Sequence, residues 1–139
     1  VFGWVAPTDG WHGMMKWAQG NTDGFLRILK RLMIRFQGKI IDLWVDRARW
    51  HRGERVEIFQ REHCQLHLHY LPAYHPELNY QEPLWRTMRY EETTNAFFET
   101  QEILEVSIFK RSQRWKPQKI KSLCPVSYTH LTLPTIYSV

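Results

Sequence analysis

IIDLWV (residues 40–45) and QLHLHYL (residues 65–71) are the two stretches of sequence that decide the fold. The first is apolar on both faces except at Asp42, which is typical of a strand buried inside a sheet. In the second, apolar and polar residues alternate, so one face of a strand is expected to be buried. A helical stretch over about residues 53–62 lies between them. Strand, helix and strand within so short a distance predict a right-handed crossover between parallel strands.

The sequence before this unit predicts a hairpin followed by a helix. Aromatic-rich runs over residues 1–7 and 11–18 flank Asp9-Gly10, and Asp-Gly between such runs is a strong hairpin signal. A helix is expected over about residues 22–36, where apolar side chains recur at the spacing of a buried stripe. That stripe consists of Phe25, Leu29, Leu32 and Phe36.

Two more helices are expected after the second strand. One begins near Pro83, a residue suited to a first helical turn, and runs to about Tyr90. The other is amphipathic and spans about residues 99–115, with Ile103, Leu104, Val106, Ile108 and Phe109 as its apolar face. The whole pattern predicts an α/β fold with a mixed sheet and flanking helices.

Composition excludes several broad classes of protein. The chain has 139 residues and is 43% hydrophobic, with no apolar run near the roughly 20 residues of a membrane helix. Two cysteines are too few for a disulfide framework, so a reducing cytoplasm is the expected compartment. A net charge of +5 favours a polyanionic partner. Membrane, secreted and fibrous classes are therefore set aside.

The last fifteen residues, PVSYTHLTLPTIYSV (residues 125–139), differ from the rest because they contain no Asp, Glu, Lys or Arg. The codons GTC TCT TAT ACA CAT CTG ACG CTG CCG ACG spell residues 126–135, and that string resembles an adapter of transposon-based sequencing libraries. We therefore interpret residues 125–139 as a non-native tail, a translated sequencing adapter, and exclude it from the reasoning about the fold. The alternative is a natural disordered or strand-like tail.

Two carboxylates are placed where chemistry is expected. Asp46 directly follows the buried strand, and the carboxyl ends of parallel strands open onto the ligand crevice. Glu82 lies near a helix start, after a loop long enough to return it to the same edge. Carboxylate oxygens suit Mg²⁺ or Mn²⁺. The alternative for a strand-end Asp is a turn or helix-cap role.

VDRARWH (residues 45–51) followed by LHYLPAYHPELNYQEPLWRTMRY (residues 68–90) resembles the second half of the catalytic core of DDE-type transposases. The resemblance is to the bacterial insertion-sequence family related to mariner elements. The family pattern has a strand-end Asp, a His five residues later, Leu-Pro-x-Tyr-x-Pro-Glu-Leu-Asn, a catalytic Glu and a Trp. Here these positions match Asp46, His51, residues 71–79, Glu82 and Trp85, and 35 residues separate the two carboxylates.

The resemblance implies an RNase H-like mixed sheet and metal-dependent DNA cleavage and strand transfer by the full-length parent. Asp46, Glu82 and His51 would be catalytic, and the two acids would be metal ligands for Mg²⁺ or Mn²⁺, with two ions in the complete site. A first catalytic Asp is expected on a strand upstream of residue 1. Residues 1–124 would then be a partial catalytic domain, truncated at its N-terminus, that is inactive alone.

The same resemblance implies DNA as the partner, both element ends and target, together with a homodimeric parent and no membrane. The expected location is the bacterial cytoplasm, with the protein associated with the nucleoid when it is bound to DNA. Basic residues around an acidic centre would neutralise phosphates, and those chosen are Arg47, Arg49, Arg52, Arg86 and Arg89. Arg47 departs from the family pattern, which usually has Asn there. The alternative for these arginines is an ordinary solvated surface.

The sequence also permits other functions. The chain could be a non-catalytic DNA-binding remnant, or a metal nuclease of the same RNase H-like fold that cuts without joining ends. His51 could orient the site, bind phosphate or simply pack. A zinc site is disfavoured, because the spacing of the candidate ligands matches no common structural site; these are His63, Cys64, His67 and His69.

Overall fold

The computed structural model describes residues 1–125 and 135–138 of the chain. In these residues one sheet contains five strands: β1 (Phe2–Ala6), β2 (Trp11–Met15), β3 (Ile41–Val45), β4 (Leu66–Tyr70) and β5 (Thr135–Ser138). The helices are α1 (Thr22–Arg35), α2 (Glu54–Glu62), α3 (Gln81–Thr93), α4 (Gln101–Arg114) and α5 (Pro117–Leu123), with short 3₁₀ turns η1 (Arg49–His51) and η2 (Pro76–Leu78). None of these helices is long and apolar enough to cross a membrane.

The sheet is mixed, with strand order β2-β1-β5-β3-β4. β1 and β2 pair antiparallel, which confirms the hairpin expected around Asp9-Gly10. β3 and β4 pair parallel, with Ile41 opposite Leu66 and Val45 opposite Tyr70. The crossover through α2 is therefore confirmed, and the carboxyl ends of β3 and β4 lie at the same edge of the sheet.

The centre of the sheet is formed by residues from the C-terminal tail. β5 pairs antiparallel with β1 and parallel with β3, with Tyr137 opposite Val5 on one side and Trp44 on the other. Part of the segment that was excluded from the reasoning about the fold, Thr135–Ser138, thus forms a strand of the sheet. Residues 126–134 and 139 lie outside the described residues. Thr, Ile and Tyr favour strands. Their pairing with β1 and β3 joins segments that are far apart in the sequence, so no local pattern predicts it.

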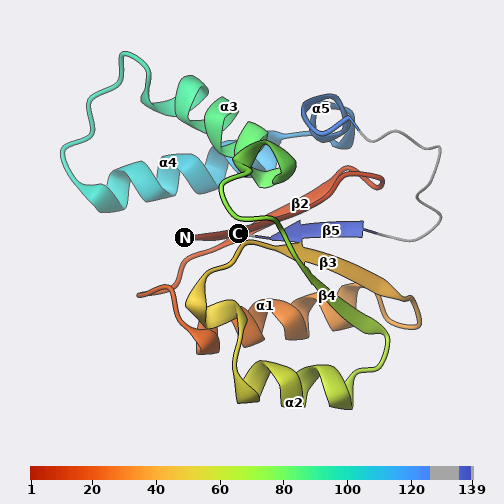
Figure 1. The fold of residues 1–139 in the computed structure, drawn as a ribbon. Helices are drawn as coiled ribbons and strands as arrows, with labels where there is room; N and C mark the ends of the chain where they lie inside the picture. The colour runs from red at the N-terminus through yellow and green to blue at the C-terminus, as the bar shows by residue number, and fades with distance from the viewer. Residues whose placement is uncertain (126–134, 139) are drawn as a thin grey trace.

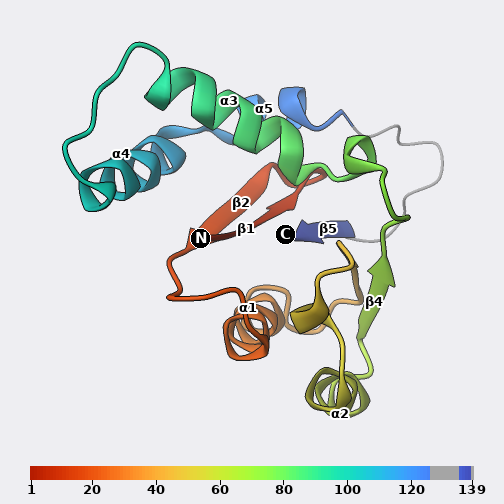
Figure 2. The ribbon, with the colours of Figure 1, turned by 60° about the vertical axis from the view of Figure 1, so that its left-hand side comes forward.

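Helices cover both faces of the sheet (Figures 1 and 2). α1 and α2 lie on one face, and α3, α4 and α5 lie on the other. Alternation along β1 serves both layers, because Phe2 and Trp4 enter the core beneath α1 while Val5 enters the core beneath α3 and α5. The two cores therefore hold the sheet rigidly between them.

α1 forms where the sequence predicts it. Asn21 caps it, because its side-chain oxygen accepts a hydrogen bond from the Gly24 backbone N–H at 2.9 Å. The predicted stripe is buried, and each of its residues is at most 1% exposed. These residues are Phe25, Leu29, Leu32 and Phe36. Burial of these large apolar side chains against β1 and β3 supplies most of the helix's stability.

α4 departs from expectation. Its bounds agree with the prediction, but Ile103 and Val106 are 49% and 51% exposed, and Ser112 is its one buried residue. α4 is held to α3 largely by polar contacts, since Glu92 accepts hydrogen bonds from both Ser107 and Arg111. The predicted apolar face is therefore only half-buried, with Leu104, Ile108 and Phe109 partly covered and Ile108 packed against the core under α3 and α5.

Candidate active site

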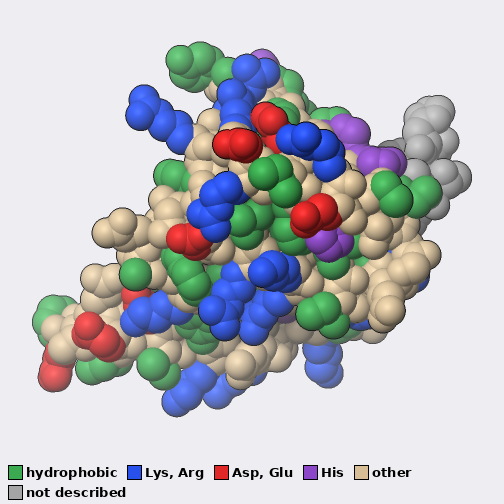
Figure 3. Space-filling view, turned by 90° about the horizontal axis from the view of Figure 1, so that it is seen from below, with side chains coloured by type: hydrophobic (Ala, Val, Ile, Leu, Met, Phe, Trp, Pro, Cys, Tyr) green, Lys and Arg blue, Asp and Glu red, His purple; other side chains and the backbone are tan. Residues whose placement is uncertain are grey.

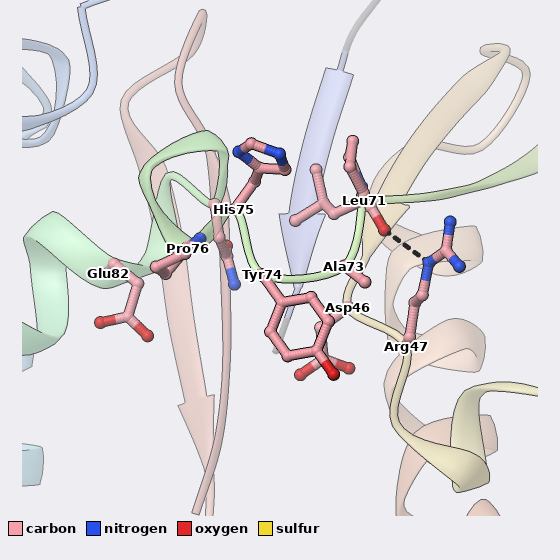
Figure 4. Close-up of a pocket in the computed structure, with 10 residues that line it drawn as sticks. Asp46, Arg47, Leu71, Ala73, Tyr74, His75, Pro76 and Glu82 are labelled. Carbon is pink, nitrogen blue, oxygen red and sulfur yellow. Dashed lines mark hydrogen bonds between the residues drawn. The ribbon is translucent and has the colours of Figure 1, made fainter.

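An open cavity of about 380 Å³ lies at the carboxyl edge of β3 and β4. Asp46 lines it from the residue after β3, and Glu82 lines it from the first turn of α3. The loop of residues 71–76 forms one wall between them. Figure 4 shows both carboxylates pointing to the same side of the cavity, in front of the ends of the strands. The two carboxylates expected at this edge thus share one cavity.

Asp46 is held by two hydrogen bonds to one of its oxygens. Its Oδ1 accepts from the Ala48 backbone N–H at 2.9 Å and lies 2.8 Å from His51 Nδ1. Burial by itself would raise the pKa of the Asp46 carboxyl, but these two donors outweigh it and hold the pKa below its usual value. A lowered pKa in the folded chain means that Asp46 stabilises the fold above about pH 4. That contribution is lost as the pH falls through the folded-state pKa.

His51 is a fully buried side chain that turns its ring toward Asp46. Its exposed fraction is 0%, and its ring packs 4.4 Å from the ring of Phe25 on α1. Nδ1 also lies 3.2 Å from the Asp46 backbone oxygen, so Nδ1 carries the proton and donates it. Nε2 is buried with no hydrogen-bond partner in the described part of the chain. Of the roles considered for His51, this burial supports orienting Asp46 rather than contacting a phosphate.

Replacing His51 by Ala is expected to destabilise the fold by about 2–4 kcal/mol and to raise the pKa of Asp46. The variant removes a packed ring and a donor to Oδ1 together. His51→Asn is the matched control, because its side-chain amide can occupy the position of Nδ1 and keep the donor. Urea unfolding and an NMR titration of the Asp46 carboxyl give the two readouts. Equal Asp46 pKa values in His51→Ala and in the unchanged chain would contradict the positioning role.

Glu82 is positioned by Asn79, a residue to which the sequence analysis gave no role. Asn79 is 6% exposed, and its side-chain oxygen accepts a hydrogen bond from the Gln81 backbone N–H at 3.0 Å. Its backbone oxygen accepts from the Glu82 N–H, also at 3.0 Å. Asn is a favoured capping residue, so its place just before the helix was the available signal.

Tyr74 is the strained residue of the cavity wall. Its φ angle is +61°, a left-handed conformation that a bulky side chain rarely adopts, and its side chain is 99% exposed. Strain of this kind gathers at functional sites because the surrounding structure must enforce it. Figure 4 shows the Tyr74 ring in front of Asp46. No sequence signal marked this residue beyond its place in the motif.

The carboxylate oxygens of the cavity are the type of ligand that a hard divalent cation takes. Asp46 leaves Oδ2 without a hydrogen bond, and the Glu82 carboxylate has no hydrogen-bond or ion-pair partner within the described ranges. Mg²⁺ is commonly bound by one or two carboxylates, with waters and substrate phosphates completing the shell. No group of three His, Cys, Asp or Glu able to hold a metal occurs among the residues that the structure describes. The two carboxylates are therefore donors of the kind that a hard divalent cation takes, and an ion here would need further ligands from solvent or substrate.

The five arginines chosen from the sequence are all exposed. Arg47 lines the cavity, and its Nε donates to the Leu71 backbone oxygen at 3.0 Å, which ties together the ends of β3 and β4. Arg52 lies over the ring of Tyr70, 4.9 Å from its centroid. Arg49 is exposed on η1, and Arg86 and Arg89 are exposed on α3.

Among the residues that the structure describes, the histidine and cysteine candidates are not gathered into a group of three that could hold a metal, although His67 and His69 both lie near Asp42. His69 Nε2 lies 2.7 Å from Asp42 Oδ1, and His63 Nδ1 bonds to the Phe59 backbone oxygen of its own helix. Cys64 is an exposed free thiol. Cys124 is buried, and burial raises the pKa of its thiol to about 12, which keeps it protonated and unreactive.

The sequence model of one protein family, described as "DDE superfamily endonuclease", matches residues 1–105. The match extends over both cavity carboxylates, His51 and all five arginines. No curated protein and no solved structure matches this chain.

Proposed function

Because the chain belongs to the DDE superfamily endonucleases, we propose that it is the catalytic domain of a DNA transposase. The observation that carries this proposal is the shared cavity, which is lined both by Asp46, the residue after β3, and by Glu82 in the first turn of α3. The motif that joins them favours the insertion-sequence family related to mariner elements. In the full-length parent the activity would be metal-dependent cleavage of DNA strands followed by strand transfer.

Each group of residues at the cavity has its own role in this proposal. Asp46 and Glu82 hold Mg²⁺ or Mn²⁺, and the complete site takes two ions. The bound ions supply Lewis-acid activation of water and stabilisation of the leaving oxygen. His51 keeps Asp46 Oδ1 occupied and so leaves Oδ2 facing the cavity. Arg47, Arg49, Arg52, Arg86 and Arg89 contact the phosphates of element ends and target DNA.

The same proposal extends to the whole protein, of which this chain is one part. Its fold is RNase H-like, with residues 1–124 as part of the catalytic domain and residues 125–139 as a tail of foreign origin. A third carboxylate completes the metal site, and because the described cavity offers two, the chain is inactive by itself. The parent is a homodimer in the bacterial cytoplasm and associates with the nucleoid when it binds DNA.

Mn²⁺ binding tests the two ligands directly. Asp46→Asn and Glu82→Gln are each expected to weaken Mn²⁺ affinity by about tenfold or more, since even outer-shell changes commonly cost that much. Electron paramagnetic resonance of free Mn²⁺ measures the affinity. Glu57→Gln, an exposed change on α2, is the matched control and is expected to bind as the unchanged chain does.

Equal Mn²⁺ affinity in all four proteins would contradict the ligand assignment. The unchanged chain is also expected not to nick supercoiled plasmid in Mn²⁺. Nicking that Asp46→Ala abolishes would contradict the proposal that the chain is inactive alone.

A non-catalytic DNA-binding remnant is the second candidate. It is favoured by the absence, in the described part of the chain, of a group of three metal-ligating side chains. Such a remnant would bind DNA in a salt-sensitive manner that is indifferent to Mg²⁺ and to Glu82→Gln. A third candidate, a metal nuclease of the same fold, would yield cleaved DNA without joined products.

A further inference from the structure

α1 carries a row of cations on the side opposite to its buried stripe. Arg27 is three residues before Lys30 and four before Arg31, Arg35 is four residues after Arg31, and all four are exposed. We call these four residues the α1 basic stripe. Figure 3 views the molecule from the side of α1 and α2 and shows Lys and Arg side chains gathered near the middle of this face.

The protein leaves these charges uncompensated. No member of the α1 basic stripe makes an ion pair with any residue in the described ranges, although ion pairs form elsewhere. Asp23, the acidic residue in the first turn of α1, is bound instead to Arg55 on α2 at 2.7 Å. Like charges at these intervals repel one another and weaken an isolated helix. A polyanion along the helix would remove that repulsion.

Aromatic rings hold the two ends of the α1 basic stripe in place. The Arg27 guanidinium lies 5.5 Å from the centroid of Trp17, and that of Arg35 lies 5.6 Å from the centroid of Trp11. Such contacts restrict the arginine side chains without neutralising them. Guanidinium groups fixed in this way lose less entropy when they bind phosphate oxygens.

The dimensions suit the backbone of a DNA duplex. Arg27 and Arg35 are eight residues apart, which is about 12 Å along a helix axis. A duplex presents about one phosphate charge per 1.7 Å of its axis, so this length faces several phosphates on each strand.

α1 packs against the candidate active site through its buried face. The rings of Phe25 on α1 and His51 are 4.4 Å apart, whereas the α1 basic stripe lies on the exposed side of the helix. Acidic side chains also lie near the stripe, because Asp23 is in the first turn of α1 and Glu62 of α2 lines a groove together with Lys30.

We propose that the α1 basic stripe is a second contact for duplex DNA, separate from the arginines around the cavity, that binds the phosphate backbone without reading sequence. The inference rests on the proposed function in one respect, namely that the polyanion is DNA. It adds a binding surface on the α1 layer of the sheet, whereas Arg86 and Arg89 lie on the α3 layer.

Duplex binding as a function of salt tests this surface. Lys30→Gln/Arg31→Gln removes the two central charges of the α1 basic stripe. Lys116→Gln/Lys121→Gln removes two exposed charges at α5, on the opposite layer, and is the matched control. Fluorescence anisotropy with a labelled duplex measures Kd between 50 and 200 mM salt, after circular dichroism has shown that each variant is folded.

The α1 variant is expected to weaken binding on the order of tenfold and to lower the slope of log K against log salt by about two. The α5 control is expected to keep the slope of the unchanged chain. Equal losses in both variants would reveal a general charge effect and overturn the proposal.

A third variant separates this inference from the proposed function. If Arg86→Gln/Arg89→Gln weakens binding while Lys30→Gln/Arg31→Gln does not, the second surface is refuted and the cavity arginines stand. If the unchanged chain binds no duplex, both proposals fail. If loss of Lys30 and Arg31 impairs binding to phosphatidylserine vesicles but not to DNA, the surface is a membrane contact and the DNA assignment is overturned.

Discussion

Deleting residues 135–139 is expected to abolish the cooperative unfolding transition of the chain. β5 pairs with β3 through four residue positions and with β1 through two, so its loss exposes the inner edges of both strands. Those edges lie between two cores, where Val5, Leu43 and Val45 are 0% exposed. Each buried backbone group left without a partner costs about 1–3 kcal/mol, and a few of them exceed a typical domain's total stability of about 5–15 kcal/mol.

Thermal unfolding followed by circular dichroism measures this effect. The matched control deletes Val139 alone, which leaves the whole of β5 in the chain. An unchanged transition after the larger deletion would show that β1 and β3 hold together without β5. The tail would then be dispensable for the fold.

Gly10→Ala is expected to cost about 2–4 kcal/mol of stability. Gly10 has a φ of +67°, which a Cβ disfavours. A Cβ there would also lie 2.5 Å from the Pro117 backbone oxygen at the start of α5. Backbone cannot rotate away as a side chain can, so either the hairpin or α5 must move.

Gly38→Ala separates the two causes. Gly38 has a similar φ of +74°, but a Cβ there meets nothing within 4 Å. It is expected to lose about 1 kcal/mol, the cost of the left-handed conformation alone. Guanidinium unfolding gives both values, and equal losses in the two variants would refute the close contact between the turn and α5.

Local patterns were sufficient to predict much of the fold. The hairpin at Asp9-Gly10, the buried stripe of α1 and the β3–α2–β4 crossover were all predicted correctly, because each depends on periodicity and turn chemistry within a few residues. The positions of Asp46 at a strand end and Glu82 near a helix start were predicted in the same way. Alternation and capping act over short distances, so a single sequence displays them.

Tertiary structure decided the features that depend on contacts between distant segments. Thr135–Ser138 pairs with β1 and β3, which lie more than half the chain away in the sequence. The burial of His51 against Phe25 and the exposure of Ile103 on α4 depend on which helix covers which face. By itself the sequence determined the elements and the candidate carboxylates, whereas packing decided which charges and side chains were covered. The reason is that burial is a property of the assembled sheet and its two helical layers, and no window of sequence contains that information.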